Sequence, residues 1–468
     1  MLKYGGKYVN YTGMQREKMK IRFAFPSRLR KKNFISSLSL LLVICAFLLL
    51  FLKFTVKYSI TIETYGSTAG YNDIELLHRY NIDCNAIYEM EPAELGKSLV
   101  IRKQVVVEEQ DKSLVNLISN CPRYLRSRGY GDVQVSEEEQ AFPLAYSLVV
   151  HKSASMVEKI LRAVYTPNNI YCIHYDLKSS ELFRESMEGL ARCLPNVFIA
   201  SKLEAVTYAS ISRLNADLNC LSDLIGSKVK WRYVINLCGQ DFPLRSNIEL
   251  VADLKKLRGG NMMETSRPSE YKKQRFSFHH ELQNASFEYH RLPVKTNKAK
   301  GPPPHGIQMF IGSAYFVLSL EFVTYMNKSA LARDFLMWSN DTYSPDEHFW
   351  ATLTRVPGVP GEVPRAQADI TDLMSKTRLV KWNYLEGPLY PSCTGKHVRS
   401  VCIYGAGELR WLLNYGSWFA NKVDAKVDPV LIQCLEDTLQ EKQRLLVKAM
   451  KSQQKIPSSV LAVDVILQ

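Results

Sequence analysis

The chain has 468 residues of ordinary globular composition, and its 60 Lys or Arg against 46 Asp or Glu give a formal net charge of +14. Residues 1–32 hold ten of these basic residues and a single acid, Glu17, so the remaining 436 residues carry a net charge of only +5. This small excess argues against a nucleic-acid-binding surface and fits anionic small ligands.

An uncharged, largely apolar run of twenty residues, Asn33 to Leu52, follows the basic segment. At a helical rise of about 1.5 Å per residue it spans the ~30 Å hydrocarbon core of a bilayer. The run is longer than that of a signal peptide, and the basic residues before it keep the N-terminus in the cytoplasm. We therefore expect a type II membrane protein, with a cytoplasmic tail at 1–32 and a signal anchor at 33–52.

The lumenal remainder divides by composition. Residues 53–120 are polar and weakly periodic, which is typical of a stem that holds a domain away from the membrane. We expect a catalytic domain at 121–438 and a C-terminal tail at 439–468.

The cysteines agree with an oxidising compartment. One of ten, Cys45, lies in the apolar run, and the other nine form no CxxC pair, which argues against a zinc ribbon. Nine lumenal cysteines indicate up to four disulfides and one free thiol. N-glycosylation sequons begin at Asn284, Asn327 and Asn340.

Strand and helix patterns alternate from residue 145 onward. This order predicts an α/β domain with a largely parallel sheet. The expected strands are residues 145–150, 170–175, 197–200, 233–237 and 311–318, and the expected helices are residues 154–165, 180–193, 248–257 and 429–447. The polar, Pro-rich residues 268–304 are expected to form a long functional loop.

Parallel sheets bind ligands beyond the carboxyl ends of their strands, which here are followed by His151 and Asp176. No Gly-rich phosphate loop follows the first strand, and no Asp-x-Asp metal motif occurs in the chain. If the ligand is a nucleotide diphosphate, Arg399 and Lys422 are candidates to neutralise it, although either can be a solvated surface charge.

Residues 342–350, Thr-Tyr-Ser-Pro-Asp-Glu-His-Phe-Trp, crowd two carboxylates and a histidine before an aromatic run. One interpretation is a capping box, in which Ser344 is the N-cap, Pro345 the first helical residue and Glu347 the N3 glutamate of a helix. The other is a catalytic site in which Glu347 acts as a base.

Four motifs decide between these interpretations: residues 343–347, 380–387, 393–402 and 419–422. They are similar to motifs of the β-1,6-N-acetylglucosaminyltransferases that make core 2 branches on mucin-type O-glycans. The likeness covers residues 84–434. Within that family we expect it to be greatest to the type 3 core 2 enzymes.

The resemblance implies a modified GT-A fold and an inverting glycosyltransferase of the Golgi membrane that needs no metal or other cofactor. Its donor would be UDP-GlcNAc, and its acceptor the 6-hydroxyl of GalNAc in Gal-β1,3-GalNAc, the core 1 O-glycan of glycoproteins. One base suffices for such a transfer.

The resemblance also assigns roles to individual residues. Glu347 corresponds to the catalytic base, and Arg399 and Lys422 to the pair that replaces the metal on the diphosphate. The other expected UDP-sugar contacts are Val149, His151, Asp176 and Tyr208, and the expected acceptor contacts are Glu264, Lys272, Arg275, Trp382 and Tyr384. The implied disulfides are Cys84–Cys434, Cys121–Cys193, Cys172–Cys220 and Cys393–Cys402, which leaves Cys238 free.

Three alternatives stay open: a metal-dependent transferase of another sugar, a lumenal glycan-binding protein without catalysis, and β-1,6-GlcNAc transfer to core 3 or to poly-N-acetyllactosamine.

Overall fold

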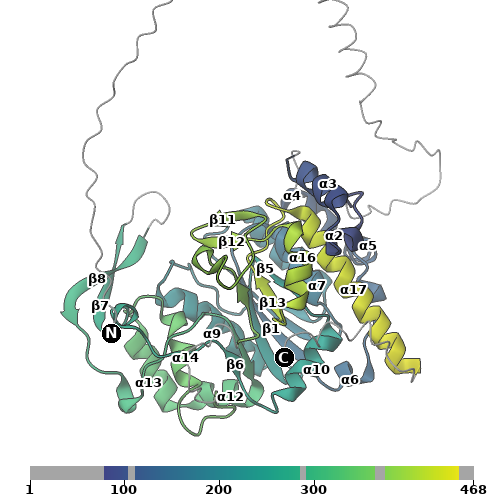
Figure 1. Ribbon diagram of the computed structural model, residues 1–468. Helices are drawn as coiled ribbons and strands as arrows, with labels where there is room; N and C mark the ends of the chain where they lie inside the picture. The colour runs from purple at the N-terminus through teal and green to yellow at the C-terminus, as the bar shows by residue number, and fades with distance from the viewer. Residues whose placement is uncertain (1–78, 104–110, 285–290, 364–374, 453–468) are drawn as a thin grey trace, which may run out of the picture. The chain divides into compact units, whose positions relative to one another are not determined.

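A computed structural model describes residues 79–103, 111–284, 291–363 and 375–452 (Figure 1). All described residues belong to one compact unit, residues 73–468. The predicted anchor at 33–52 and the tail at 1–32 lie outside the described residues. In the part of the chain that the structure describes, no helix is long and apolar enough to cross a membrane.

The centre of the fold is a six-stranded sheet with the strand order β3-β2-β1-β4-β9-β6. The first four of these strands run parallel, whereas β9 is antiparallel to both of its neighbours. Their bounds are β1 Leu144–Val150, β2 Ile170–Tyr175, β3 Val197–Ile199, β4 Tyr233–Cys238, β6 Met262–Met263 and β9 Phe316–Ser319. The α/β prediction is therefore confirmed, but the strand expected from residue 311 begins only at Phe316.

Helices cover both faces of this sheet (Figure 1). The side chains of β1 alternate between two cores: Tyr146 and Leu148 belong to one hydrophobic cluster, and Ala145 to the other. The first cluster packs under α7 Ala154–Val164, α8 Glu181–Cys193, α10 Asn247–Lys256 and α16 Leu409–Asn414, and the second under α9 Ile211–Ile225, α12 Leu320–Lys328, α13 Ala330–Ser339 and α14 Phe349–Leu353.

The N-terminal helices of the described region pack on the first core. They are α2 Cys84–Tyr88, α3 Pro92–Lys103, α4 Asp111–Ile118, α5 Cys121–Ser127 and α6 Glu137–Gln140. Ile87, Leu114 and Ile118 are fully buried there. Most of these helices lie in the segment for which the sequence predicts a stem. The C-terminal helix α17 Pro429–Ser452 likewise continues past residue 438.

Four disulfides join these elements, and they are the pairs that the resemblance implies: Cys84–Cys434, Cys121–Cys193, Cys172–Cys220 and Cys393–Cys402. Cys238 is free. The first pair connects α2 to α17, so chain segments separated by 350 residues lie side by side.

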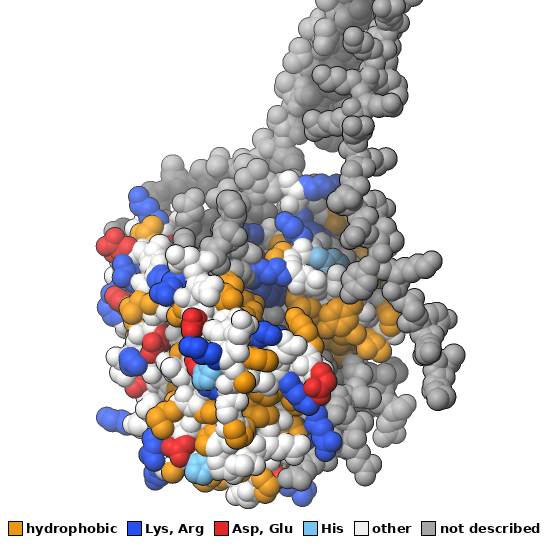
Figure 2. All heavy atoms as spheres, turned by 90° about the vertical axis from the view of Figure 1, so that its left-hand side faces the viewer, with side chains coloured by type: hydrophobic (Ala, Val, Ile, Leu, Met, Phe, Trp, Pro, Cys, Tyr) orange, Lys and Arg blue, Asp and Glu red, His pale blue; other side chains and the backbone are white. Residues whose placement is uncertain are grey.

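Three smaller sheets complete the fold. A three-stranded sheet contains β10 Leu379–Val380, β13 Phe419–Asn421 and β5 Asp241–Pro243, and a two-stranded one contains β11 Lys396–Val398 and β12 Val401–Ile403. The third is the hairpin of β7 Phe278–Asn284 and β8 Arg291–Ala299, on the side of the molecule that faces the viewer in Figure 2.

The prediction of a loop at 268–304 is wrong, because these residues contain the short helix α11 Glu270–Lys273 and the β7–β8 hairpin. Most side chains of the hairpin are at least partly exposed, so its strands lack the alternation of apolar and polar residues by which a strand is recognised.

Candidate active site

The carboxyl ends of β1 and β2 carry three of the expected nucleotide contacts. Val149 lies within β1, and His151 and Asp176 directly follow β1 and β2. The Asp176 carboxylate accepts hydrogen bonds from the backbone nitrogens of Lys178 and Val206, at 2.9 and 3.3 Å. Polar groups therefore gather at the sheet edge where an α/β fold binds its ligand.

Lys422, which directly follows β13, lies within electrostatic range of this edge. Burial lowers the pKa of His151 below its usual value, and the positive charges of Lys152, Lys178 and Lys422 lower it further, against the opposing effect of Asp176. His151 is therefore uncharged at neutral pH. The positive charge available to an anionic ligand at this edge comes from lysines, of which Lys422 is one.

Glu347 ends the short 3-10 helix Pro345–Glu347. Ser344, just before it, has a left-handed backbone (φ 47°), makes no side-chain capping bond, and donates its backbone N–H to the Ala209 carbonyl at 2.8 Å. The Glu347 carboxylate, about a third exposed at 36%, accepts a hydrogen bond from the Arg275 guanidinium. The capping-box interpretation is therefore wrong, because the carboxylate turns toward Arg275 and not back to Ser344.

The two residues beside Glu347 face different surroundings. Burial raises the pKa of Asp346 to about 7, with a further contribution from Glu347 and an opposing one from Arg213. His348 is fully buried against the rings of Phe276 and Phe335, and burial lowers its pKa to about 3. Of the three polar residues, only Glu347 is a partly exposed carboxylate.

Arg275 also supports the neighbouring backbone. Its carbonyl accepts a hydrogen bond from the Tyr343 nitrogen at 2.8 Å, and its guanidinium lies 5.5 Å from the centre of the Tyr343 ring. An expected acceptor residue is thus in direct contact with the expected base. Lys272 lies three residues earlier, in α11.

Glu264 approaches the same place through its backbone. The Gly312 nitrogen donates to the Glu347 carbonyl at 2.8 Å, and a Cβ atom at position 312 would lie only 1.8 Å from the Glu264 carbonyl oxygen. Only glycine permits this close approach, which holds the strand end near Glu264 against the segment of Glu347.

The segment 206–209 joins the sheet edge to the base. Val206 contacts Asp176, and Ala209 accepts the Ser344 N–H. Tyr208, between them and about half exposed at 49%, lies close enough to Tyr343 to help raise the pKa of that ring, which burial also raises. The expected nucleotide contacts and Glu347 therefore belong to one continuous region.

The aromatic pair Trp382 and Tyr384 lies beside the turn that carries Arg399. Their rings stack with centroids 5.8 Å apart and an interplanar angle of 27°. The Asn383 nitrogen donates to the Ser400 carbonyl at 2.9 Å, and Arg399 and Ser400 both have positive φ in the turn between β11 and β12. The expected acceptor platform and the expected diphosphate clamp thus lie on adjacent, hydrogen-bonded segments.

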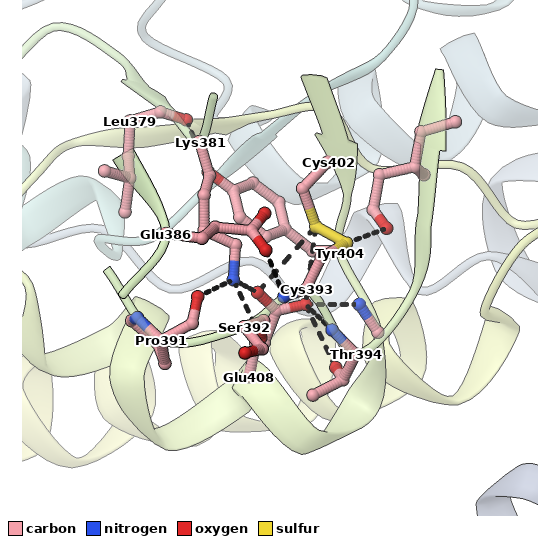
Figure 3. Close-up of polar contacts among 12 residues, drawn as sticks. Leu379, Lys381, Glu386, Pro391, Ser392, Cys393, Thr394, Cys402, Tyr404 and Glu408 are labelled. Atoms are coloured by element: carbon pink, nitrogen blue, oxygen red, sulfur yellow. Dashed lines mark hydrogen bonds and ion pairs between the residues drawn. A yellow bond between two sulfur atoms is a disulfide. The ribbon is translucent and has the colours of Figure 1, made fainter. Parts of the chain in front are cut away.

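A buried ion pair lies beneath these segments (Figure 3). Lys381 and Glu408 are 0% and 1% exposed and contact each other directly. The Lys381 ammonium also donates to the carbonyls of Pro391 and Ser392, at 3.0 and 3.2 Å. Sequence reasoning missed this pair, although Lys381 directly precedes Trp382 in one of the recognised motifs.

The Glu408 carboxylate anchors both sides of the Cys393–Cys402 disulfide loop. One of its oxygens accepts from the backbone nitrogen and hydroxyl of Thr394, at 3.1 and 3.0 Å, and from the Gly405 nitrogen at 3.0 Å (Figure 3). The Cys402 nitrogen donates to the Lys381 carbonyl at 2.9 Å. One buried pair therefore fixes both the loop of Arg399 and the segment of Trp382.

The described residues contain one group with metal-ligand atoms close together, Glu386, Cys393 and Cys402. Its two sulfur atoms form the disulfide of the Arg399 loop, so they are not thiolates that could bind a metal.

The sequence matches the Core-2/I-Branching enzyme family over residues 144–413. It is 60% identical over 422 residues to a β-1,3-galactosyl-O-glycosyl-glycoprotein β-1,6-N-acetylglucosaminyltransferase 4 from Danio rerio, covering 90% of this chain and 97% of that protein. It is 60% identical over 369 residues to the type 4 enzyme from Mus musculus, with 79% and 81% of the two chains covered.

The chain belongs to the Core-2/I-branching enzymes and is a glycosyltransferase. The identity to the type 3 enzyme of Mus musculus is 41% over 381 residues, covering 80% of this chain and 86% of that protein. The expectation of greatest likeness to type 3 enzymes is therefore wrong, since the type 4 relatives are more similar.

Proposed function

We propose that the protein transfers GlcNAc from UDP-GlcNAc, with inversion, to the 6-hydroxyl of GalNAc in Gal-β1,3-GalNAc on glycoproteins, forming core 2 branches. The observation that carries the proposal is the partly exposed Glu347 carboxylate. It is held by Arg275 next to the carboxyl edge of the sheet, in a chain whose relatives are named β-1,6-N-acetylglucosaminyltransferases.

In this mechanism Glu347 removes the proton of the acceptor 6-hydroxyl as its oxygen attacks the anomeric carbon of GlcNAc. The bond from that carbon to the diphosphate oxygen breaks on the opposite side, and UDP departs with the bonding electrons. Arg399 and Lys422 stabilise the charge that develops on the diphosphate, which is the role a metal has in other transferases.

The remaining residues bind the two substrates. Val149, His151, Asp176 and Tyr208 hold the uridine nucleotide. Trp382 and Tyr384 offer flat rings to a sugar face. Glu264, Lys272 and Arg275 hydrogen-bond its hydroxyls. The fold is accordingly a GT-A fold without the Asp-x-Asp metal motif, and no cofactor is required.

We further propose that the protein is a single-pass type II protein of the Golgi membrane, anchored by residues 33–52, with its catalytic domain in the lumen. The four disulfides support a lumenal domain, since such bonds persist in oxidising compartments. Asn284, Asn327 and Asn340 are all exposed, as N-glycosylation requires.

The test is to incubate the purified full-length chain with UDP-GlcNAc, excess EDTA and separate core 1, core 3 and lactosamine acceptors. Transfer to core 1 in EDTA supports the proposal. Transfer only to core 3 or lactosamine would favour the alternative acceptors, and transfer only after metal addition would refute the metal-free mechanism. Binding of the glycan without transfer would favour an inactive glycan-binding protein.

A further inference from the structure

The positive charge beyond the predicted anchor is concentrated in one segment. Residues 33–468 hold fifty Lys or Arg against forty-five Asp or Glu, a net charge of +5. Residues 267–300 alone hold eight Lys or Arg against three Glu, which is also a net charge of +5. The rest of the chain beyond residue 32 is therefore neutral, and this basic segment stands out from it.

The basic segment consists mainly of α11 and the β7–β8 hairpin. The hairpin lies on the side of the molecule shown in Figure 2. Arg291, Lys295 and Lys298 are exposed on β8. Two of them contact neutral groups: Arg291 donates to the Leu282 carbonyl at 3.4 Å, and Lys295 to the Gln274 side chain at 3.0 Å. Among the described residues, no carboxylate neutralises these three charges.

Lys300, another cation of the segment, is neutralised, and its contacts help to fix the hairpin in place. Lys300 and His279 both contact the Asp341 carboxylate, and the His280 nitrogen donates to the Asp341 carbonyl at 2.9 Å. Asp341 lies two residues before Tyr343, whose nitrogen donates to Arg275. The hairpin is thus attached to the segment that carries Glu347.

The hairpin has a second connection to the base. Lys295, on β8, donates to the side chain of Gln274, and Gln274 directly precedes Arg275, which contacts Glu347. A polypeptide attached to a sugar at Glu347 continues outward from this point. Exposed charges attract opposite charges over about 8 Å at physiological salt, so the exposed basic side chains of β8 can act on what surrounds the acceptor sugar.

We propose that Arg291, Lys295 and Lys298 form a docking surface for acidic stretches of the acceptor polypeptide on either side of the glycosylated Ser or Thr. This inference rests on the proposed function, because it needs a glycoprotein acceptor at Glu347. It assigns the surface to the polypeptide and not to the acceptor disaccharide. Charges at the rim of an interface change the association rate and its salt dependence.

The experiment compares three acceptors that carry the same Gal-β1,3-GalNAc: the free benzyl disaccharide, a glycopeptide flanked by Asp and Glu, and the same glycopeptide flanked by Asn and Gln. We expect the wild-type KM to be about threefold to tenfold lower for the acidic than for the neutral glycopeptide at low ionic strength. We expect this preference to disappear at about 0.5 M NaCl, because salt screens the attraction between exposed charges.

The double variant Arg291→Glu and Lys298→Glu removes this preference and leaves kcat and the KM for the benzyl disaccharide unchanged. Its matched control is Lys228→Glu with Lys230→Glu, which alters the net charge equally. These exposed lysines precede β4, at the edge of the sheet opposite His151 and Asp176. The control keeps the wild-type preference.

Equal wild-type KM values for the two glycopeptides would overturn the inference, as would loss of the preference in the control. A fourth acceptor, the sialylated disaccharide, tests the other source of negative charge. If the wild type prefers it to the neutral disaccharide and the hairpin variant does not, the surface binds acidic glycan and the inference is overturned. If the wild type does not glycosylate the benzyl disaccharide at all, the proposed function itself fails.

Discussion

The Arg275 guanidinium donates a hydrogen bond to the Glu347 carboxylate, 72 residues away in the chain. Arg275 comes from the loop after α11, and Glu347 from the 3-10 helix before α14. The contact orients the carboxylate away from the Ser344 backbone, and it joins the residue expected to act as base to one expected to bind the acceptor.

Substitution of Arg275 should affect the acceptor and not the donor. Arg275→Ala removes a charged hydrogen bond, so we expect the KM for core 1 to rise by about tenfold or more while UDP affinity stays unchanged. Steady-state kinetics and calorimetry measure the two quantities. Arg267→Ala, an exposed position in the same basic segment, is the control and should change neither. If UDP affinity in Arg275→Ala falls by as large a factor as the KM for core 1 rises, the acceptor role is contradicted.

Lys381 should be needed for substrate binding beyond its effect on stability. Lys381→Met leaves Glu408 buried without its cation, at a cost of about 3 to 5 kcal/mol of unfolding free energy. Because the pair holds the Arg399 loop and Trp382, we expect UDP affinity to fall and the KM for the acceptor to rise together. Glu408→Gln keeps one oxygen that can accept from Thr394 and Gly405, but its amide cannot neutralise Lys381, so we expect the same two defects.

The control for this prediction is the buried pair of Arg162 and Glu436, which joins α7 to α17. Its Nη2 and Oε1 atoms are 2.5 Å apart. Arg162→Met should lower the melting temperature by a similar amount without changing the affinity of the remaining folded protein for UDP. If Lys381→Met and Arg162→Met differ only in stability, the pair has no positioning role.

The Cys393–Cys402 disulfide should matter more for the donor site than for the whole fold. It closes a loop of nine-residue separation, so replacing both cysteines by Ser should cost only about 3 kcal/mol of stability. We expect UDP affinity to fall because Arg399 lies in that loop. Replacement of Cys84 and Cys434 by Ser opens a much longer loop and should lower stability more, with UDP affinity preserved. The reverse ranking of UDP affinities would refute this division.

Asp346 should make stability depend on pH. Its folded-state pKa of about 7 lies above the unfolded value, so the protonated carboxyl stabilises the fold at low pH, and this contribution is lost as pH rises through about 7. Asp346→Asn should therefore gain stability relative to wild type between pH 5 and pH 8, on the order of a few kcal/mol. Melting temperatures at several pH values measure the difference, and a constant difference across this range would contradict the buried, protonated state.

The sequence predicted those parts of the fold that rest on local patterns. The strands at 144–150 and 170–175 are buried on both faces, and such strands are continuous apolar runs. Helix α9 was missed because Asn, Ser and Asp, which are poor helix formers, interrupt its apolar residues. The β7–β8 hairpin was missed because its stability comes from backbone pairing and from Asp341, which lies elsewhere in the chain.

The same distinction applies to the site. The motifs around Glu347, Trp382 and Arg399 were visible as linear sequence. The contact of Glu347 with Arg275 and that of Lys381 with Glu408 join residues 72 and 27 positions apart, and nothing in a single sequence pairs them. The capping box had the right residue types at the right spacing, but the left-handed backbone of Ser344 prevents it.

The most direct test of the central claim is the turnover number of Glu347→Gln with UDP-GlcNAc and a core 1 acceptor in excess EDTA. Glutamine keeps the size of the side chain and one oxygen that can accept from Arg275, but it cannot take a proton from the acceptor hydroxyl. We predict that kcat falls by about 10³-fold or more, while the melting temperature and UDP affinity stay close to those of the wild type. A variant that turns over within a few-fold of the wild type would show that Glu347 is not the base.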